Sequence, residues 1–468
     1  MFMRLYNTAT KQIEDFKPLN PPNVALYSCG PTVYDYTHIG HLRAYVNVDL
    51  LKRSLVYLDG FKVNHVMNIT DVGHLTGDDD TGEDKLEKGA KKKGLDIWDL
   101  VKIYTDYFFS SLSALNIKKP NNFYTATGHI KEEINLIEKL FEDGFAYETD
   151  EAVYFNTANF KNYGALSGQK LNEKILGARE NVHVDTKKKN PADFVLWFKA
   201  VGRFKNHIMR WPSPWGDGFP GWHIECSAIS MKYLGETIDI HAGGVDHISV
   251  HHENEKAQSE AATGKPFVKY WFHSEFLMVD GRKMSKSLGN FYTIGDVKNK
   301  GFDPMALRLL YLQTHYRQTM NFTWDALEAA DTAYKRLKNH ILELKEKTGN
   351  KKADIVASKY KQEFRDELLN DLQTPKAVAI LWEVVKADIE PDEKLALILN
   401  FDEILGLGLD EADVVKADIP EEIIKLTKER EVAREEKNFA KSDELRQKIN
   451  EKGYEIKDTE EGYKITKR

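Results

Sequence analysis

The stretch that decides the fold begins with VALYSC at residues 24–29. Apolar and aromatic residues dominate this run, which predicts a strand that ends at the turn Gly30-Pro31-Thr32. Leu, Val and Tyr then recur at helical spacing over residues 42–58, and the run KVNHVMNI at residues 62–69 predicts a second strand. A strand, a helix and a strand at this spacing indicate a βαβ unit, so we expect a parallel sheet with helices on its faces.

Strand-like runs return later in the chain. At residues 237–240 and 276–279 we expect further strands of the same sheet. The intervening residues 120–205 have a different pattern of expected elements, with a helix at 130–143 and a strand at 152–155. They are therefore interpreted as an insertion that splits the sheet domain.

Beyond about residue 325 the chain is almost wholly helical. Four helices are expected first, at residues 325–347, 353–370, 375–386 and 394–405. After a linker at 406–420 we expect one charged helix at 423–451 and β-like runs at 454–456 and 463–465. The predicted organisation is a sheet domain at 1–119 and 206–290, an insertion at 120–205, a segment at 291–325, a helical bundle at 326–415 and a small domain at 416–468.

Composition narrows the class of protein. The 468 residues include 41% hydrophobic and 30% charged residues, with no apolar run near the roughly 18 residues that span a bilayer. Two cysteines cannot form a disulfide framework, so we expect a cytoplasmic protein in a reducing compartment. The net charge of −7 argues mildly against a nucleic-acid partner. Residues 421–468, however, carry thirteen basic and thirteen acidic residues, so local basic patches are not excluded.

His38-Ile39-Gly40-His41 lies between the first strand and the first helix. A helix start offers free backbone N–H groups and the positive end of the dipole, which suit a phosphate. Two histidines three residues apart could donate hydrogen bonds to that phosphate, and Gly40 would let a nucleotide ring approach the backbone. The plainer alternative is a pair of surface histidines at a helix start.

Lys283-Met284-Ser285-Lys286-Ser287 follows an expected strand and is flanked by Gly281 and Gly289. Two lysines on a mobile loop can close over a polyphosphate and neutralise charge on its leaving group. The alternative is a solvated basic loop. The chain has no P-loop motif, so a P-loop enzyme is excluded.

The only two cysteines, Cys29 and Cys226, suggest a metal site together with His251 and Glu255. Residues four apart share one face of a helix, so this imidazole and this carboxylate could point at the same ion. Two thiolates from elsewhere would complete a mixed set of ligands suited to zinc, in either a closed structural site or an open one. The alternative is that each cysteine is only a small buried apolar residue.

Together, the motifs at residues 38–41 and 283–287 resemble the pair of signature motifs found in class I aminoacyl-tRNA synthetases. Five further segments resemble the cysteinyl-tRNA synthetase family, so that the likeness covers essentially the whole chain. They are CGPTVY at 29–34, WHIEC at 222–226, DIHAGGVD at 239–246, HHENE at 251–255 and NDLQTP at 370–375.

The resemblance implies both a fold and an activity. The fold is a Rossmann-like α/β catalytic domain with a connective insertion, an all-α anticodon-side bundle and a small C-terminal α+β domain for anticodon recognition. Residues 291–325 would contact the tRNA stem. The activity is the ligation of L-cysteine to cysteine tRNA: ATP and cysteine give cysteinyl adenylate and pyrophosphate, and cysteine then passes to the terminal adenosine. The protein would act as a monomer, with no membrane or DNA partner.

The same resemblance implies site residues. Catalytic roles fall to His38, His41, Lys283 and Lys286. ATP, accompanied by Mg²⁺, would contact His38, Gly40, His41, His241, Gly243, Asp246 and Lys286. The substrate cysteine would contact Cys29, Gly30, Thr70 and Trp222. One Zn²⁺ per chain would be held by Cys29, Cys226, His251 and Glu255, and it would select a thiolate over the hydroxyl of serine, since soft sulfur ligands suit zinc.

Candidate tRNA contacts are Lys425, Lys428, Arg430 and Arg434, although each could equally be a solvated residue on a charged helix. The acidic stretch at 77–84 lacks the ligand spacing of a calcium loop and is interpreted as a loop at the rim of the site. Two rival functions are considered: a cysteine ligase with an amino-sugar acceptor, which would share the signature motifs and the zinc ligands, and a non-catalytic RNA-binding paralogue. The long helical C-terminal region counts against the first, and the intact motifs count against the second.

Overall fold

The computed structural model describes residues 2–73, 75, 82–168, 185–348, 359–411, 420–459 and 462–467. The expected acidic loop lies mostly outside these residues. The chain forms two compact units, Met1–Leu409 and Asp410–Arg468. Among the described residues, no helix combines the length and the apolar character needed to cross a membrane.

A five-stranded parallel sheet forms the centre of the larger unit, as the βαβ pattern predicts. In sheet order its strands are β11 (Val268–Ser274), β10 (Ile238–Gly244), β3 (Asn23–Ser28), β4 (Lys62–Ile69) and β5 (Asn122–Thr125). Helix α1 (Ile39–Tyr57) makes the crossover from β3 to β4. The expected strands at 24–29 and 62–69 are therefore confirmed, and the first of them lies in the middle of the sheet.

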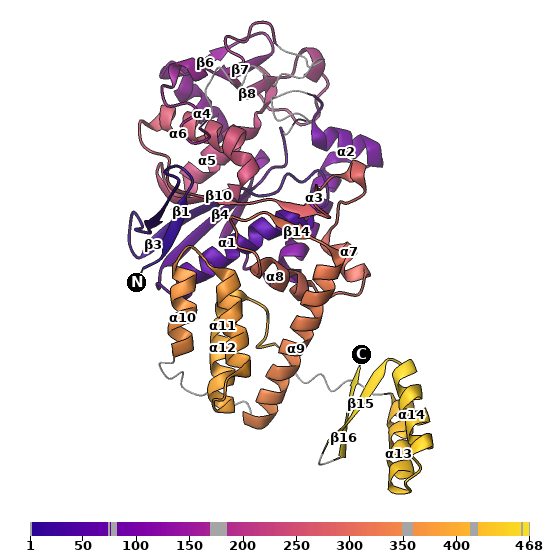
Figure 1. Cartoon of the computed structure of the whole chain (residues 1–468). Helices are drawn as coiled ribbons and strands as arrows, with labels where there is room; N and C mark the ends of the chain where they lie inside the picture. The colour runs from indigo at the N-terminus through magenta and orange to yellow at the C-terminus, as the bar shows by residue number, and fades with distance from the viewer. Residues whose placement is uncertain are drawn as a thin grey trace. The chain divides into compact units, whose positions relative to one another are not determined.

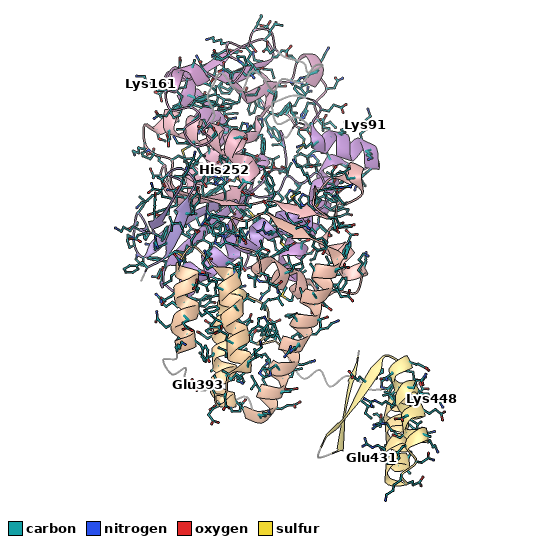
Figure 2. The ribbon with its side chains drawn as sticks, viewed as in Figure 1. Lys91, Lys161, His252, Glu393, Glu431 and Lys448 are labelled. Atoms are coloured by element: carbon teal, nitrogen blue, oxygen red, sulfur yellow. The ribbon has the colours of Figure 1, made fainter. Side chains whose placement is uncertain are left out.

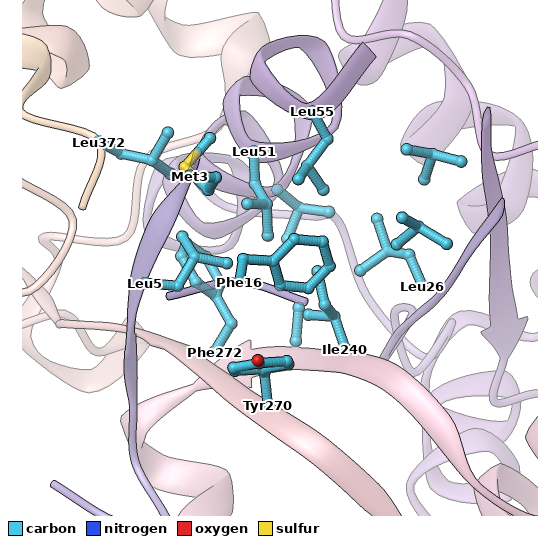
Figure 3. Packing of buried hydrophobic residues seen from close by; sticks show 14 of the residues in the cluster. Met3, Leu5, Phe16, Leu26, Leu51, Leu55, Ile240, Tyr270, Phe272 and Leu372 are labelled. Atoms are coloured by element: carbon cyan, nitrogen blue, oxygen red, sulfur yellow. The ribbon is translucent and has the colours of Figure 1, made fainter. Parts of the chain in front are cut away.

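Both faces of this sheet are buried. On one face, Leu26 and Ile240 pack with Leu51 of α1 and with Phe16, whose ring centroid lies 5.0 Å from that of Tyr270 (Figure 3). The N-terminal hairpin of β1 (Arg4–Asn7) and β2 (Gln12–Asp15) closes this core. On the other face, side chains of β3, β4 and β11 pack against helix α5 (Trp222–Leu234).

The insertion is displaced from its expected limits. Strand β5, at 122–125, belongs to the parallel sheet, and its short polar sequence NFYT gives little sign of this. The smaller antiparallel sheet consists of β6 (Ala146–Glu148), β7 (Ala152–Phe155), β8 (Phe194–Lys199) and β9 (Gly218–Pro220). It thus extends past the expected limit of 205, because Gly218 to Pro220 pair with β8 although they lack a strand-forming sequence. Helix α4 (Ile130–Glu142) confirms the expected helix.

The expected strand of the main sheet at residues 276–279 is wrong. Strand β12 (Leu277–Val279) pairs with β13 (Arg282–Lys283) and β14 (Met320–Phe322) in a separate three-stranded sheet. The edge of the main sheet is taken instead by β11, whose run VKYWFHS is almost wholly buried. The remaining helices of this region are α2 (Lys85–Lys93), α3 (Ile97–Ala114), α6 (Glu253–Thr263), α7 (Ile294–Asn299) and α8 (Pro304–Leu312).

Four long helices follow, as predicted, and they lie on the opposite side of the main sheet from the smaller sheet (Figure 1). They are α9 (Trp324–Thr348), α10 (Lys359–Leu369), α11 (Thr374–Lys386) and α12 (Pro391–Leu405). The start of the second expected helix, at 353–358, lies outside the described residues. This bundle belongs to the same compact unit as the sheet.

The smaller unit has its own core of Ile423, Ile449, Tyr454 and Ile456. The single expected helix at 423–451 is wrong, because α13 (Glu421–Glu435) and α14 (Phe439–Glu451) are separate. Lys437 has a positive φ of 61°, and the Asn438 side chain caps the second helix. The hairpin of β15 (Tyr454–Thr459) and β16 (Gly462–Lys467) completes the expected α+β arrangement.

Candidate functional site

The candidate site lies at the carboxyl ends of the parallel strands, where open α/β sheets bind their ligands. Cys29 follows β3, Thr70 follows β4, and Gly243 and Gly244 end β10. Sequence separation is large, but the parallel pairing of β3 with both β4 and β10 brings these ends together. The metal and substrate residues predicted from sequence therefore meet at one edge.

The four expected metal ligands form one buried group. The ligand atoms of Cys29, Cys226, His251 and Glu255 all lie within 4.8 Å of one another. His251 occupies a short π-helical turn, Ile248–His252, that precedes α6, and its Nε2 lies 2.8 Å from Oε1 of Glu255. The i, i+4 spacing thus places the two side chains together, as expected. The adjacent His252 is buried, whereas Lys91 and Lys161 are exposed; all three are labelled in Figure 2.

A second set of four shares two of these ligands. Cys29, His241, His252 and Glu255 also have their ligand atoms within 4.8 Å of one another. His241 Nε2 lies 2.8 Å from Glu255 Oε2, and His252 Nε2 lies 3.3 Å from Cys29 Sγ. The expected contact of His241 with ATP stays a prediction, and the side chain of His241 is fully buried against Glu255. Such contacts orient the ligating atoms of a metal site.

The Nδ1 atoms of His251 and His252 form hydrogen bonds with two further histidines. His223 Nδ1 and His251 Nδ1 share a hydrogen bond of 2.9 Å, and the Trp222 ring stacks on His251 with centroids 4.4 Å apart. His252 Nδ1 shares a bond of 2.7 Å with His273 Nε2, whose other nitrogen lies 2.7 Å from Thr8 Oγ1. Trp222, predicted to contact cysteine, thus lies directly on a candidate metal ligand.

The charges of this group suit a cation. Burial raises the pKa of Glu255, but His241 and His251 outweigh it and lower that pKa to about 2, so the side chain is a carboxylate. Burial also opposes ionisation of Cys29, yet the hydrogen bond from Cys226 and the nearby histidines lower the pKa of its thiol well below the usual value. Burial and the Cys29 thiolate raise the pKa of Cys226 instead. A divalent cation would favour ionisation of both thiols, and two thiolates, an imidazole and a carboxylate are ligands that zinc accepts.

Next to the metal group, Gly30 and Thr70 line the floor of the site. The Gly30 N–H donates to Asn68 Oδ1 at 2.7 Å, and a Cβ at Gly30 would lie only 1.7 Å from the backbone oxygen of Asn68. Thr70 Oγ1 donates to Glu225 Oε1 at 2.7 Å, while Glu225 Oε2 has no hydrogen-bond partner among the described residues. The roles of Asn68 and Glu225 were not predicted, although both lie within or beside quoted motifs.

His38 caps the first helix with its own side chain. Its Nδ1 accepts the backbone N–H groups of Gly40 and His41 at 3.1 and 3.2 Å. The expectation that these N–H groups are free to hold a phosphate is therefore wrong here. Burial and the neighbouring His41 lower the pKa of His38 to about 2, so the ring is neutral and Nε2 carries its proton. That Nε2–H is the hydrogen-bond donor which the motif retains.

The two signature motifs lie against each other. The Ile39 N–H donates to the Tyr292 carbonyl at 2.9 Å, and the Phe291 ring meets His38 edge-on at 5.1 Å. Lys286 lies over the Phe291 ring at 4.9 Å and forms an ion pair with Asp35. Partial burial lowers the pKa of Lys286. The structure thus brings together two motifs that the sequence separates widely.

The predicted catalytic residue Lys283 and the remaining predicted ATP residues differ in position. Lys283 is exposed on β13, and Asp246 is exposed in the turn after β10. Gly243 leaves room for an imidazole, since a Cβ there would lie 2.6 Å from His252 Cε1. Its lack of a side chain thus serves packing around the metal group, which the sequence did not predict.

Solved structures with a similar fold are aminoacyl-tRNA synthetases. A Mycobacterium tuberculosis methionyl-tRNA synthetase in complex with methionyl-adenylate has a TM-score of 0.54 at 14% identity, over 86% of this chain and 94% of that one. An Agrobacterium radiobacter leucyl-tRNA synthetase, solved with tRNA, has a TM-score of 0.61 at 12% identity, over 85% and 86%. At these identities the similarity concerns the fold alone.

Sequence comparison is more specific. The family model for the class I (C) tRNA synthetase catalytic domain matches residues 15–332. Cysteine–tRNA ligase of Treponema denticola is 43% identical, over 98% of both chains. Cysteine–tRNA ligase 1 of Burkholderia lata is 44% identical, over 99% of this chain and 97% of its own. The chain therefore belongs to the cysteine–tRNA ligase family of class I aminoacyl-tRNA synthetases.

Proposed function

We propose that the protein is a cysteine–tRNA ligase, which activates L-cysteine with ATP and transfers it to the terminal adenosine of cysteine tRNA. One observation supports this most: the buried group of Cys29, Cys226, His251 and Glu255 lies at the same sheet edge as the two joined signature motifs. The buried group can recognise a thiol, and the two signature motifs can hold a nucleotide.

The four residues would hold one zinc ion per chain. When bound, zinc supplies a soft Lewis acid that accepts a substrate thiolate far better than a neutral hydroxyl. Glu255 stays ionised and is held by His241, so the carboxylate keeps a fixed orientation. Gly30 and Thr70 would bound the small space for the rest of the amino acid, with Trp222 beside them.

In the activation step, the cysteine carboxylate attacks the α-phosphate of ATP and pyrophosphate leaves. His38 would donate its Nε2–H to the phosphate as negative charge develops, because its Nδ1 is occupied by the helix cap. His41 stacks on His38 with centroids 3.5 Å apart and would assist it. Lys283 and Lys286 would neutralise the leaving pyrophosphate, with Mg²⁺ accompanying ATP.

Transfer to tRNA would engage the C-terminal regions. Lys425, Lys428 and Arg434 are exposed on α13 and could contact phosphates. Arg430 is buried, so its expected contact with tRNA is wrong in this structure. We further propose that the enzyme acts in the reducing cytoplasm, which suits its two buried cysteines without a disulfide. We also propose that it is a monomer.

The test is cysteine-dependent exchange of pyrophosphate into ATP, followed by transfer of labelled cysteine to total tRNA. We expect exchange with cysteine, little with serine, and charging of tRNA. Absence of exchange would contradict the proposal, and exchange without tRNA charging would favour an amino-sugar acceptor.

The zinc assignment has its own measurement. Cys226→Ser removes one thiolate, so bound zinc, measured by elemental analysis, should fall from one per chain to well below one, together with cysteine-dependent exchange. Full zinc content in this variant would contradict the assigned ligand set.

A further inference from the structure

Lys286 has a partner within the protein before any nucleotide binds. We propose that Asp35 is a resident counter-ion of Lys286, which the phosphates of ATP must displace, so that Asp35 sets the affinity for ATP. This rests on the proposed function, in which Lys286 binds the leaving phosphates. It adds a residue of opposite charge that acts against substrate binding.

The Asp35 carboxylate has both oxygens engaged. Oδ1 accepts the N–H of Tyr36 at 2.8 Å, and Oδ2 forms the ion pair with Lys286. The Asp35 side chain is 20% exposed and that of Lys286 is 57% exposed. The pair is thus oriented by the backbone on the acid side, while the lysine side is open to solvent and to an incoming ligand.

The segment that carries Asp35 is anchored to helix α3. The Tyr36 ring meets the rings of Tyr104 and Tyr107 at 4.9 and 4.6 Å, and Lys93 lies over it at 5.3 Å. Contacts of this kind hold aromatic side chains in fixed orientations. The acid therefore stays in place when the site changes its occupant.

The loop that carries Lys286 is built differently. Gly281 and Gly289 flank it, with φ of +72° and +67°, and a Cβ at either would meet no atom within 4 Å. Glycines at positive φ allow backbone conformations that other residues resist. Of the two partners, Lys286 is the one that can move, and it can turn toward a triphosphate while Asp35 remains behind.

This arrangement makes ATP binding an exchange of partners. A partly exposed ion pair contributes only modestly, so removing the acid should tighten binding of a triphosphate by about two- to fivefold. A ligand without β- and γ-phosphates does not reach for Lys286, and its affinity should not change.

The experiment measures binding of Mg²⁺ with α,β-methylene-ATP, and of AMP, by calorimetry with the full-length protein. Asp35→Asn should tighten the triphosphate analogue by the stated factor and leave AMP unchanged. In a Lys286→Met background the same substitution should have no effect. Asp106→Asn is the matched control, because Asp106 forms an exposed pair with Lys102 on α3; it should change neither affinity.

Three outcomes would overturn the inference. They are unchanged or weaker binding of the triphosphate analogue to Asp35→Asn, equal tightening for AMP, and tightening that persists without Lys286. The last two would show that Asp35 acts only as a general negative charge. Failure of the proposed function is distinct, since the wild-type protein would then show no cysteine-dependent pyrophosphate exchange at all.

Discussion

At the scale of single residues, the candidate site depends on positions where the surrounding atoms allow only one type of residue. Gly30 is the clearest, because its α-carbon faces the backbone of β4 and leaves no space for a methyl group. The same contact places the Gly30 N–H on Asn68, directly after the candidate ligand Cys29. A change at Gly30 must therefore move the strand end that carries that ligand.

We predict that Gly30→Ala lowers stability by about 1–3 kcal/mol, the usual cost of overpacking, and raises the KM for cysteine in pyrophosphate exchange. Gly89→Ala is the control. Gly89 lies in helix α2, where a Cβ meets its nearest atoms at 3.4 and 3.5 Å, so stability should be unchanged or slightly higher. Urea unfolding and exchange kinetics of both variants give the comparison, and equal effects would contradict it.

A second prediction concerns His65, a buried histidine of β4 that lies 2.8 Å from Ser28 Oγ. Burial and the charge of Lys52 lower its pKa from the ordinary 6.5 to about 3. Between those values the unfolded chain binds a proton that the folded protein does not, so stability is full above pH 6.5 and falls as the pH falls toward 3.

The substitution His65→Gln removes this titrating imidazole. The free energy of unfolding of the wild type should therefore fall more steeply between about pH 6 and pH 4.5 than that of the variant, by up to about 1.4 kcal/mol per pH unit. Denaturant titrations across this range measure both slopes. Parallel slopes would show that His65 is not the group responsible.

The grouping of the four candidate metal ligands could be predicted from sequence, because the chain has only two cysteines and because His251 and Glu255, four residues apart, meet on one helical turn. The role of His241 could not. Both faces of β10 are buried, so the alternation of residues along the strand does not tell which face packs in the apolar core and which faces the candidate metal ligands. The same limit hid Asp35, whose pairing with Lys286 depends on where a distant loop lies.

At the scale of elements, buried charges connect the first helix to the bundle. Arg308 of α8 donates to Asp49 of α1 at 2.6 Å and to the Leu405 carbonyl at the end of α12 at 2.7 Å. Arg53 also donates to Asp49, at 2.8 Å, and to the Glu403 carbonyl. Because α1 begins with the His38 motif, the end of the bundle is fixed to the helix that carries the candidate catalytic histidines.

Arg308→Met removes the donors to the buried Leu405 and Leu115 carbonyls, while Asp49 keeps its ion pair with Arg53. The variant should therefore lower stability by about 2–6 kcal/mol, since each buried acceptor left without a donor costs about 1–3 kcal/mol. Lys102→Met, which breaks the exposed pair with Asp106 on α3, should leave stability nearly unchanged. Urea midpoints of the two variants test this, and a small effect of Arg308→Met would show that water or a rearranged side chain donates to these carbonyls.

A second junction was not predictable from the helical pattern. Asp371, between α10 and α11, accepts hydrogen bonds from the Tyr6 N–H at 2.8 Å, the Tyr316 hydroxyl at 2.5 Å and Arg317 Nε at 2.8 Å. The sequence around it contributed only to the family resemblance. Helix periodicity predicts the bundle, but it carries no information about which loop joins it to the N-terminal hairpin.

At the scale of the whole molecule, the candidate active site and the C-terminal region separate cleanly. Every candidate catalytic, ATP and metal residue lies in the unit Met1–Leu409, whereas Asp410–Arg468 has a core of its own. The sequence predicts a linker at 406–420 and a small domain from 416, and the two compact units divide at Leu409 and Asp410.

Deletion of residues 410–468 should therefore leave cysteine-dependent pyrophosphate exchange close to the wild-type rate. Charging of cysteine tRNA should fall by at least roughly tenfold, because phosphate contacts from the exposed basic residues of α13 are lost. Exchange and charging assays on the same preparation test this. Loss of exchange would show that the larger unit depends on the smaller one for its own structure.

The central place of β3 in the sheet has a consequence for synthesis on the ribosome. One edge of β3 pairs with β4 soon after both are made, but its other edge pairs with β10, which ends at Gly244. At about 5–20 residues per second, that edge waits on the order of 10–40 s for its partner to emerge. During this time the nascent chain presents an unpaired apolar strand, the kind of surface that recruits another strand, so its yield in a cell depends on protection until the second half of the sheet arrives.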